Sequence, residues 1–177
     1  MNRRNFLITA GATTGALAVA GSVWLNVAAS DEVLTMDAVA ERLNGFRGKA
    51  LVSSGKWSPA HVFNHNAQSI DYSMAGFPES KGALFQSLLG KPAFAVFAAK
   101  REMHHGLAEP IPGAYEISDS GNLDAAIDKF LASIAAFKAF EGALKPHFAY
   151  GALSKSDYAL AHAMHFFNHL SEIRVSV

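Results

Sequence analysis

Three histidines near the end of the chain, His162, His165 and His169, have the spacing of residues that share one face of a helix. They lie in the segment LAHAMHFFNHLSEI, and at about 100° of rotation per residue they fall within an arc of roughly 60°. Residues three and four apart on a helix are surface neighbours, so the rings of His165 and His169 can reach one ion at the ~2.0–2.1 Å that zinc prefers. The chemistry that this spacing offers is metal binding.

A second histidine pair lies far upstream, in WSPAHVFNHNAQSIDYS. Ser58 is a good N-cap and the proline after it suits the first helical position, so a helix is predicted to begin there with His61 and His65 on one face. Two distant helices that each carry a histidine face suggest a site inside a helical bundle. His65, His165 and His169 would supply three neutral imidazoles and leave one coordination position open, as catalytic metal sites do.

Other polar residues on these helices are candidates for proton transfer. His61 and His162 are placed to orient a ligand or relay a proton, and Glu172 follows His169 closely enough to accept a proton or to join as a carboxylate ligand. The alternative for both histidines is a polar ring satisfied by backbone or water inside the bundle. For Glu172 the alternative is a charge on the surface.

Three phrases of the sequence carry a resemblance to known proteins: W-x7-H in WSPAHVFNH, the G-F-P that follows that helix, and the ending PHFAYGALSKSDYALAHAMHFFNHL. Together they resemble the DinB-like (YfiT-type) superfamily and, more narrowly, domain-of-unknown-function family 1569, over about Asp37 to Val177. The resemblance implies an all-α fold, a four-helix bundle of the up-down-down-up type. It also implies that one histidine from the W-x7-H helix and two from the last helix hold the metal, which by position are His65, His165 and His169.

The chain departs from that family pattern at three positions and keeps the expected ligands. Asn168 stands where a further histidine is common, Tyr158 replaces a tryptophan, and Glu172 replaces a glutamine. Because relatives in the superfamily include thiol-dependent transferases, isomerases and proposed hydrolases, the resemblance implies a divalent-metal-dependent enzyme of hydrolase or transferase type. The alternatives are a non-catalytic metal-binding or partner-binding bundle and a structural bundle with inherited histidines.

The composition limits the metal and the partners. The chain has no cysteine, so any metal is bound through nitrogen and oxygen. Zinc or nickel is favoured, with iron or manganese as alternatives. Equal numbers of basic and acidic residues, 15 of each, disfavour nucleic acid as a partner. A small-molecule substrate is expected, and the 13 phenylalanines allow a homodimer.

The N-terminal segment resembles a twin-arginine export signal. Arg3 and Arg4 in MNRRNFL precede a long uncharged stretch, and cleavage is expected after Ala29. This predicts a leader over residues 1–29, the bundle domain over 30–177, the twin-arginine export machinery as a partner, and a periplasmic location. The alternative is an uncleaved membrane tether, because the uncharged stretch is long enough to cross a bilayer.

The helices must position the site, and the long loop between two of them is expected to wall it. His104 and His105 in the loop 104–120 are predicted to lie at the surface, while the loop itself is a candidate for covering the mouth of the bundle and selecting the substrate. No strand is expected apart from a short extended piece at 114–117. The expected helices are Met36–Gly48, Pro59–Ala75 with Gly76 as an αL cap, a run from Gly82 to Met103 that Pro92 kinks or splits, Leu123–Glu141 after the cap Asn122, and a last helix after Ser154 with Asp157 as its capping-box partner.

Overall fold

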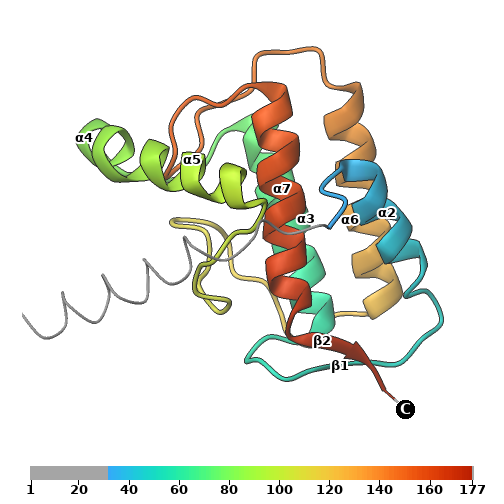
Figure 1. Ribbon diagram of the computed structural model, residues 1–177. Helices are drawn as coiled ribbons and strands as arrows, with labels where there is room; N and C mark the ends of the chain where they lie inside the picture. Colours follow the sequence, from blue (N-terminus) through green and yellow to red (C-terminus); the bar gives the residue numbers. More distant parts are fainter. Residues whose placement is uncertain (1–31, 177) are drawn as a thin grey trace, which may run out of the picture. The chain divides into compact units, whose positions relative to one another are not determined.

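The structure is a computed structural model that describes residues 32–176, and the predicted leader lies outside the described residues. The described chain is mostly helical, as predicted, and carries one short two-stranded sheet (Figure 1). In chain order its elements are α2 (Met36–Asn44), β1 (Leu51–Ser53), α3 (Pro59–Ala75), α4 (Ala83–Phe85), the π-helical turn η1 (Gln86–Gly90), α5 (Lys91–Lys100), α6 (Leu123–Ala139), α7 (Lys155–Leu170) and β2 (Ile173–Val175).

The predicted caps start the three long helices. The Ser58 side chain accepts a hydrogen bond from the backbone N–H of His61 at the start of α3. At the start of α6, the Asn122 side chain accepts one from the backbone N–H of Ala125. Ser154 and Asp157 form a reciprocal capping box at the start of α7. Each cap satisfies backbone donors that a helix leaves open at its first turn. These short-range signals therefore fix where the site-bearing helices begin.

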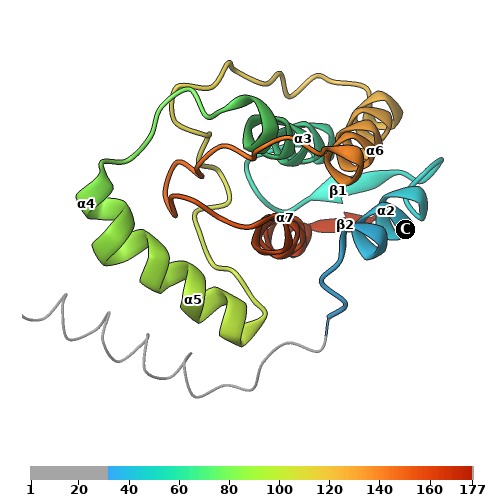
Figure 2. The same ribbon diagram turned by 90° about the horizontal axis from the view of Figure 1, so that it is seen from above.

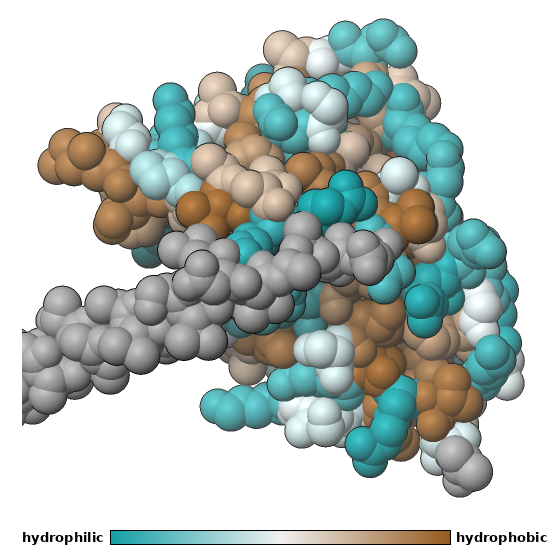
Figure 3. All heavy atoms as spheres, viewed as in Figure 1, coloured by the Kyte–Doolittle hydropathy of each residue, from teal (hydrophilic) through white to brown (hydrophobic). Residues whose placement is uncertain are grey.

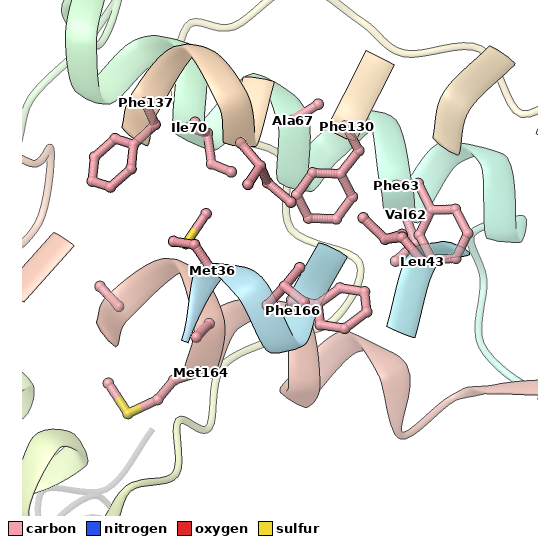
Figure 4. Packing of buried hydrophobic residues seen from close by; sticks show 14 of the residues in the cluster. Met36, Leu43, Val62, Phe63, Ala67, Ile70, Phe130, Phe137, Met164 and Phe166 are labelled. Carbon is pink, nitrogen blue, oxygen red and sulfur yellow. The ribbon is translucent and has the colours of Figure 1, made fainter. Parts of the chain in front are cut away.

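Aromatic packing holds α3, α6 and α7 together. The rings of Phe63 in α3 and Phe166 in α7 have centroids 6.4 Å apart, and Phe130 of α6 lies 6.4 Å from the first and 5.7 Å from the second (Figure 4). All three side chains are buried. Full burial of such a ring stabilises the fold by ~1.5–3 kcal/mol. The cluster keeps α3 and α7, the two histidine-bearing helices, side by side, as both views show (Figures 1 and 2).

The sheet was not predicted. β1 and β2 pair in antiparallel fashion, with Leu51 opposite Val175 and Ser53 opposite Ile173, whereas the predicted extended piece at 114–117 has no regular structure. Each strand has only three residues, so pairing between the two segments creates a structure that neither sequence encodes by itself. The pairing brings the segment that leads into α3 next to the end of α7.

The helical run does not split at Pro92, because the chain stays helical from Ala83 to Lys100 and only its hydrogen-bond pattern changes, from π-helical to α-helical, just before this residue. The turn η1 ends directly before α5, whose first turn contains Pro92, which has no N–H for a regular helical bond. Gly90 packs so closely on the carbonyl of Ala149 that a Cβ would clash with it. Gly76 ends α3 at φ 114° and ψ 139°, so the prediction of an αL cap is wrong, although the positive φ still favours glycine.

The segment formed by α4 and η1 exposes apolar side chains. Leu84, Leu88 and Leu89 of α4 and η1 are 74%, 65% and 58% exposed, and this apolar segment is visible in the space-filling view (Figure 3). Within the described residues, no helix has the length and hydrophobicity needed to cross a membrane.

Candidate metal centre

Three histidine nitrogens converge between α3 and α7. The Nε2 atom of His165 lies 3.2 Å from Nε2 of His65 and 3.1 Å from Nε2 of His169. One nitrogen from each ring falls within 4.8 Å of the other two. Nitrogens bound at ~2.0–2.1 Å to one tetrahedral ion are separated by about 3.4 Å. The spacing thus fits a single ion, and the structure brings together the three residues that the sequence predicted as a ligand set.

Trp57 packs along one side of this cluster. Its ring stacks on His61 at 4.3 Å between centroids and on His169 at 5.8 Å, and it lies tilted 4.8 Å from His65. Trp57 lies in the short segment between β1 and α3. Because β1 pairs with β2, the small sheet sets the position of this segment. Because Nδ1 of His169 is buried without a hydrogen-bond partner among the described residues, packing against Trp57 orients that ring.

Burial keeps the three imidazoles neutral. Burial, and after it the neighbouring histidines, lower the pKa of His65 to about 3 and that of His169 to about 2. Burial, followed by the adjacent His169 and His65, also holds the pKa of His165 well below its usual value. A buried positive charge is disfavoured both by loss of water and by like charges nearby. At neutral pH each ring therefore offers a lone pair, which is the form that binds a metal.

His105 lies at this cluster, so the prediction that it is on the surface is wrong. Its ring centroid is 4.9 Å from that of His165 and 5.0 Å from that of His169. His104 is exposed as predicted, with its side chain 56% accessible and 3.0 Å from Glu102. Met103 is buried, His104 exposed and His105 half-buried. This alternation is that of an extended chain, in which successive side chains point to opposite sides, and not that of a helix.

His61 stacks on Trp57 and pairs with a carboxylate. Its Nδ1 lies 2.9 Å from Oδ1 of Asp119, at ion-pair distance but without the alignment of a hydrogen bond. The backbone N–H of Ser58 donates to the same oxygen and, together with His61, holds the pKa of Asp119 below its usual range. His61 is thus linked to the loop before α6, and its predicted proton-transfer role stays a prediction.

The other two candidates for proton transfer lie in different surroundings. His162 is buried, stacks on Tyr158 at 5.4 Å, and meets the edge of Phe137 at 5.4 Å. Its Nε2 has no hydrogen-bond partner among the described residues, and burial lowers its pKa to about 3. The Glu172 carboxylate lies against Gly55, where a Cβ would clash with it. The structure therefore brings His162, but not Glu172, toward the interior.

A cavity of about 300 Å³ opens beside the cluster. His65 and His165 line it, together with His105 and His162. Its remaining walls include residues 109–112 of the loop between α5 and α6 and residues 147–150 of the turn before α7. The loop passes between α5 and α7 (Figure 2). As expected, this loop walls the site, and the cavity gives a small molecule access to two of the three convergent histidines.

His147 is a polar group of the cavity that the sequence reasoning assigned no role. The backbone N–H groups of Ala149 and Tyr150 donate to its Nδ1 at 3.1 and 3.2 Å, so the neutral ring carries its hydrogen on Nε2. Burial, with His162 nearby, lowers its pKa to about 3. A Pro-His pair in a connector has no periodicity to reveal such a role, and only the turn 147–151 places the ring at the cavity.

Comparison with known proteins identifies a family and no characterised relative. The family model described as "Protein of unknown function (DUF1569)" matches residues 30–176. Neither a curated protein nor a solved structure matches the chain. The chemistry of the site must therefore be argued from its own residues.

Proposed function

Because the chain belongs to the family described as Protein of unknown function (DUF1569), whose description names no activity, we propose from its geometry that it is a divalent-metal-dependent enzyme of the hydrolase or transferase type. One observation carries the proposal: His65 and His165 belong both to the convergent cluster and to the wall of the cavity. Structural metal sites are closed by protein ligands, whereas catalytic sites keep a position that substrate can reach.

His65, His165 and His169 would hold the ion. Their Nε2 spacing fits it, and their neutral state means that no ligand has to lose a proton to bind. An ion bound there supplies Lewis acidity toward a carbonyl or similar group of the substrate. Three imidazoles suit zinc or nickel, with iron or manganese as alternatives.

The cavity supports a small substrate that carries both apolar and polar parts. Its walls include Phe85, Ile111 and Tyr150. His147 offers an N–H donor, because its other ring nitrogen already accepts two backbone N–H groups. A substrate of this kind would bury its apolar part against these walls and direct an acceptor oxygen toward His147.

Among the proton-transfer candidates we favour His162. It lines the cavity with an unpartnered Nε2 buried close to the site. His61, stacked on Trp57, and Glu172, packed on Gly55, do not line the cavity. We propose that these two support the cluster from outside the cavity and do not touch the substrate.

The finer features of the fold and location belong to the same proposal. The helices α2, α3, α6 and α7 pack around one core, which supports a DinB-like bundle of the up-down-down-up type. The twin-arginine motif in the leader supports export of the folded protein to the periplasm, with a tether if the leader is retained. Homodimerisation stays an expectation from the composition.

A non-catalytic metal-binding bundle is the second candidate. The observation that favours it is His105, whose ring stands beside the cluster with an unpartnered nitrogen. Four imidazoles would fill the shell of a tetrahedral ion and leave the cavity without access to it.

Elemental analysis tests the proposal directly. The untagged protein, purified without chelator, is expected to carry about one divalent ion per chain, and the combined variant His65→Ala, His165→Ala, His169→Ala none. His104→Ala is the matched control, because it removes an exposed histidine and should keep the ion. A native protein that stays free of metal after reloading with zinc, nickel or manganese would overturn the proposal. A loaded protein can then be screened against hydrolase and transferase substrates.

A further inference from the structure

The ring of His105 has a defined protonation pattern. Its Nδ1 lies 3.0 Å from the carbonyl oxygen of Gly106, and a carbonyl oxygen only accepts hydrogen bonds. Nδ1 must therefore carry the hydrogen, and a neutral imidazole then has its lone pair on Nε2. A backbone carbonyl bound to one ring nitrogen is the arrangement that commonly fixes the tautomer of a metal-binding histidine.

That lone pair is buried and unused. Nε2 of His105 is inaccessible to solvent and has no hydrogen-bond partner among the described residues. A buried polar atom without a partner costs ~1–3 kcal/mol, and a bound ion or water would remove that cost. The atom belongs to a ring that also lines the cavity.

The ring of His105 stands beside two of the three convergent histidines. Their mutual centroid separations are 5.0 Å for His65 and His165, 5.1 Å for His65 and His169, and 4.8 Å for His165 and His169. His105 stands 4.9 Å from His165 and 5.0 Å from His169, at the same spacing. The loop thus adds a fourth ring to the cluster.

The loop can bring this nitrogen onto an ion. Met103 and Ile111 are buried on either side of His105 and anchor the segment, while the residues between them form no helix or strand. A short irregular segment adjusts its backbone more readily than α3 or α7, whose cores are packed. Because the convergent group comprises only the nitrogens of the three helix-borne histidines, ligation by His105 requires a shift of the loop toward nitrogens that the helices hold in place.

We propose that His105 is a fourth nitrogen ligand, supplied by the loop, of the ion that His65, His165 and His169 hold. This inference rests on the proposed metal site and deepens it, because it ties catalysis to the identity of the ion. Four imidazoles complete the shell of a tetrahedral zinc ion. An ion that takes five or six ligands keeps a position that faces the cavity, so a catalytic site with His105 bound favours nickel, iron or manganese.

The test compares neighbouring histidines in the full chain. Zinc affinity is measured by competition with a chromophoric chelator for the native protein, His105→Ala, His105→Gln, His104→Ala and His165→Ala. We expect both His105 variants to bind zinc more than about 100-fold more weakly than the native protein, beyond the roughly 10–100-fold that loss of an outer contact costs. His104→Ala should bind zinc normally. X-ray absorption of the zinc-loaded native protein is expected to count four imidazoles and His105→Gln three.

The outcomes separate this inference from the proposed function. If His165→Ala loses zinc, the His105 variants bind as His104→Ala does, and the native protein shows three imidazoles, then His105 is no ligand and the three-histidine proposal stands. If the native protein binds no zinc, nickel or manganese, both proposals are overturned. Circular dichroism of His105→Gln, which keeps a polar side chain of similar size, distinguishes a lost ligand from a misfolded variant.

Discussion

Two groups of histidines differ in where their nitrogens go, although four of the five residues line the same cavity. In the first group, Nε2 of His165 lies within hydrogen-bond distance of Nε2 of His65 and of Nε2 of His169. In the second group, His147 uses Nδ1 to accept two backbone N–H groups and His162 packs between Tyr158 and Phe137. Burial depresses the pKa of histidines in both groups to about 3.

The difference shows that burial and a low pKa do not by themselves make a metal site. Both groups are desolvated and neutral, yet convergent lone pairs with ligand spacing occur only in the first among the described residues. In the second group, Nδ1 of His147 accepts hydrogen bonds within the turn before α7, and the ring of His162 packs against aromatic side chains. Perturbed pKa values therefore locate the pocket, and the direction of the lone pairs assigns the chemistry within it.

The largest effect is expected from removing the histidine at the centre of the first group. His165→Ala should lower zinc affinity by at least about 100-fold, because its Nε2 lies next to the Nε2 atoms of both His65 and His169. His162→Ala, one turn away on the same helix, should change zinc affinity by less than about 10-fold. Isothermal titration of both variants measures the contrast. Equal losses in the two variants would show that the groups act as one site.

The pH dependence of stability is expected to sharpen the comparison. His147 and His162 have a folded pKa of about 3 against the usual 6.5, so the unfolded chain binds more protons than the folded chain between those values. Folding stability of the metal-free protein should then fall as the pH drops below 6.5 and continue to fall until about pH 3. Each such histidine contributes a slope of about 1.4 kcal/mol per pH unit.

Replacing one titrating histidine measures how much that residue contributes to the pH dependence of stability. His162→Phe keeps an aromatic ring between Tyr158 and Phe137 and removes the group that titrates. Its free energy of unfolding, measured by urea denaturation from pH 4 to 7, should show a slope that is shallower by about 1.4 kcal/mol per pH unit. A slope equal to that of the native protein would mean that His162 takes up a proton in the folded state.

The helix-borne part of the site could be predicted from the sequence because its signals are local. Ser58 and Ser154 mark the helix starts, and a period of 3.6 residues then places His65, His165 and His169 on inward faces. Aromatic packing of α3 against α7 then brings the histidine-bearing faces of the two helices together. Local propensity and long-range packing agree there.

The loop-borne part could not be predicted, because its geometry depends on contacts between distant segments. The sequence predicts His105 at the surface together with His104, whereas the chain after Lys100 leaves the helix through Arg101 at φ 55° and then alternates in burial. The pairing of β1 with β2 and the packing of Gly90 on Ala149 are long-range contacts of the same kind. No periodicity encodes such contacts.

The smallest effect is expected at Tyr158, which supports the second group and not the first. Its hydroxyl donates to the carbonyl of Lys145 at 2.6 Å, and its ring stacks on His162. Tyr158→Phe removes one hydrogen bond and keeps the ring, so the free energy of unfolding should fall by ~0.5–1.5 kcal/mol. Zinc affinity should stay within about 2-fold of the native value, since Tyr158 does not touch the convergent nitrogens. A change in zinc affinity larger than the change in stability would couple the two groups, and the second would then have to be counted among the residues that position the metal.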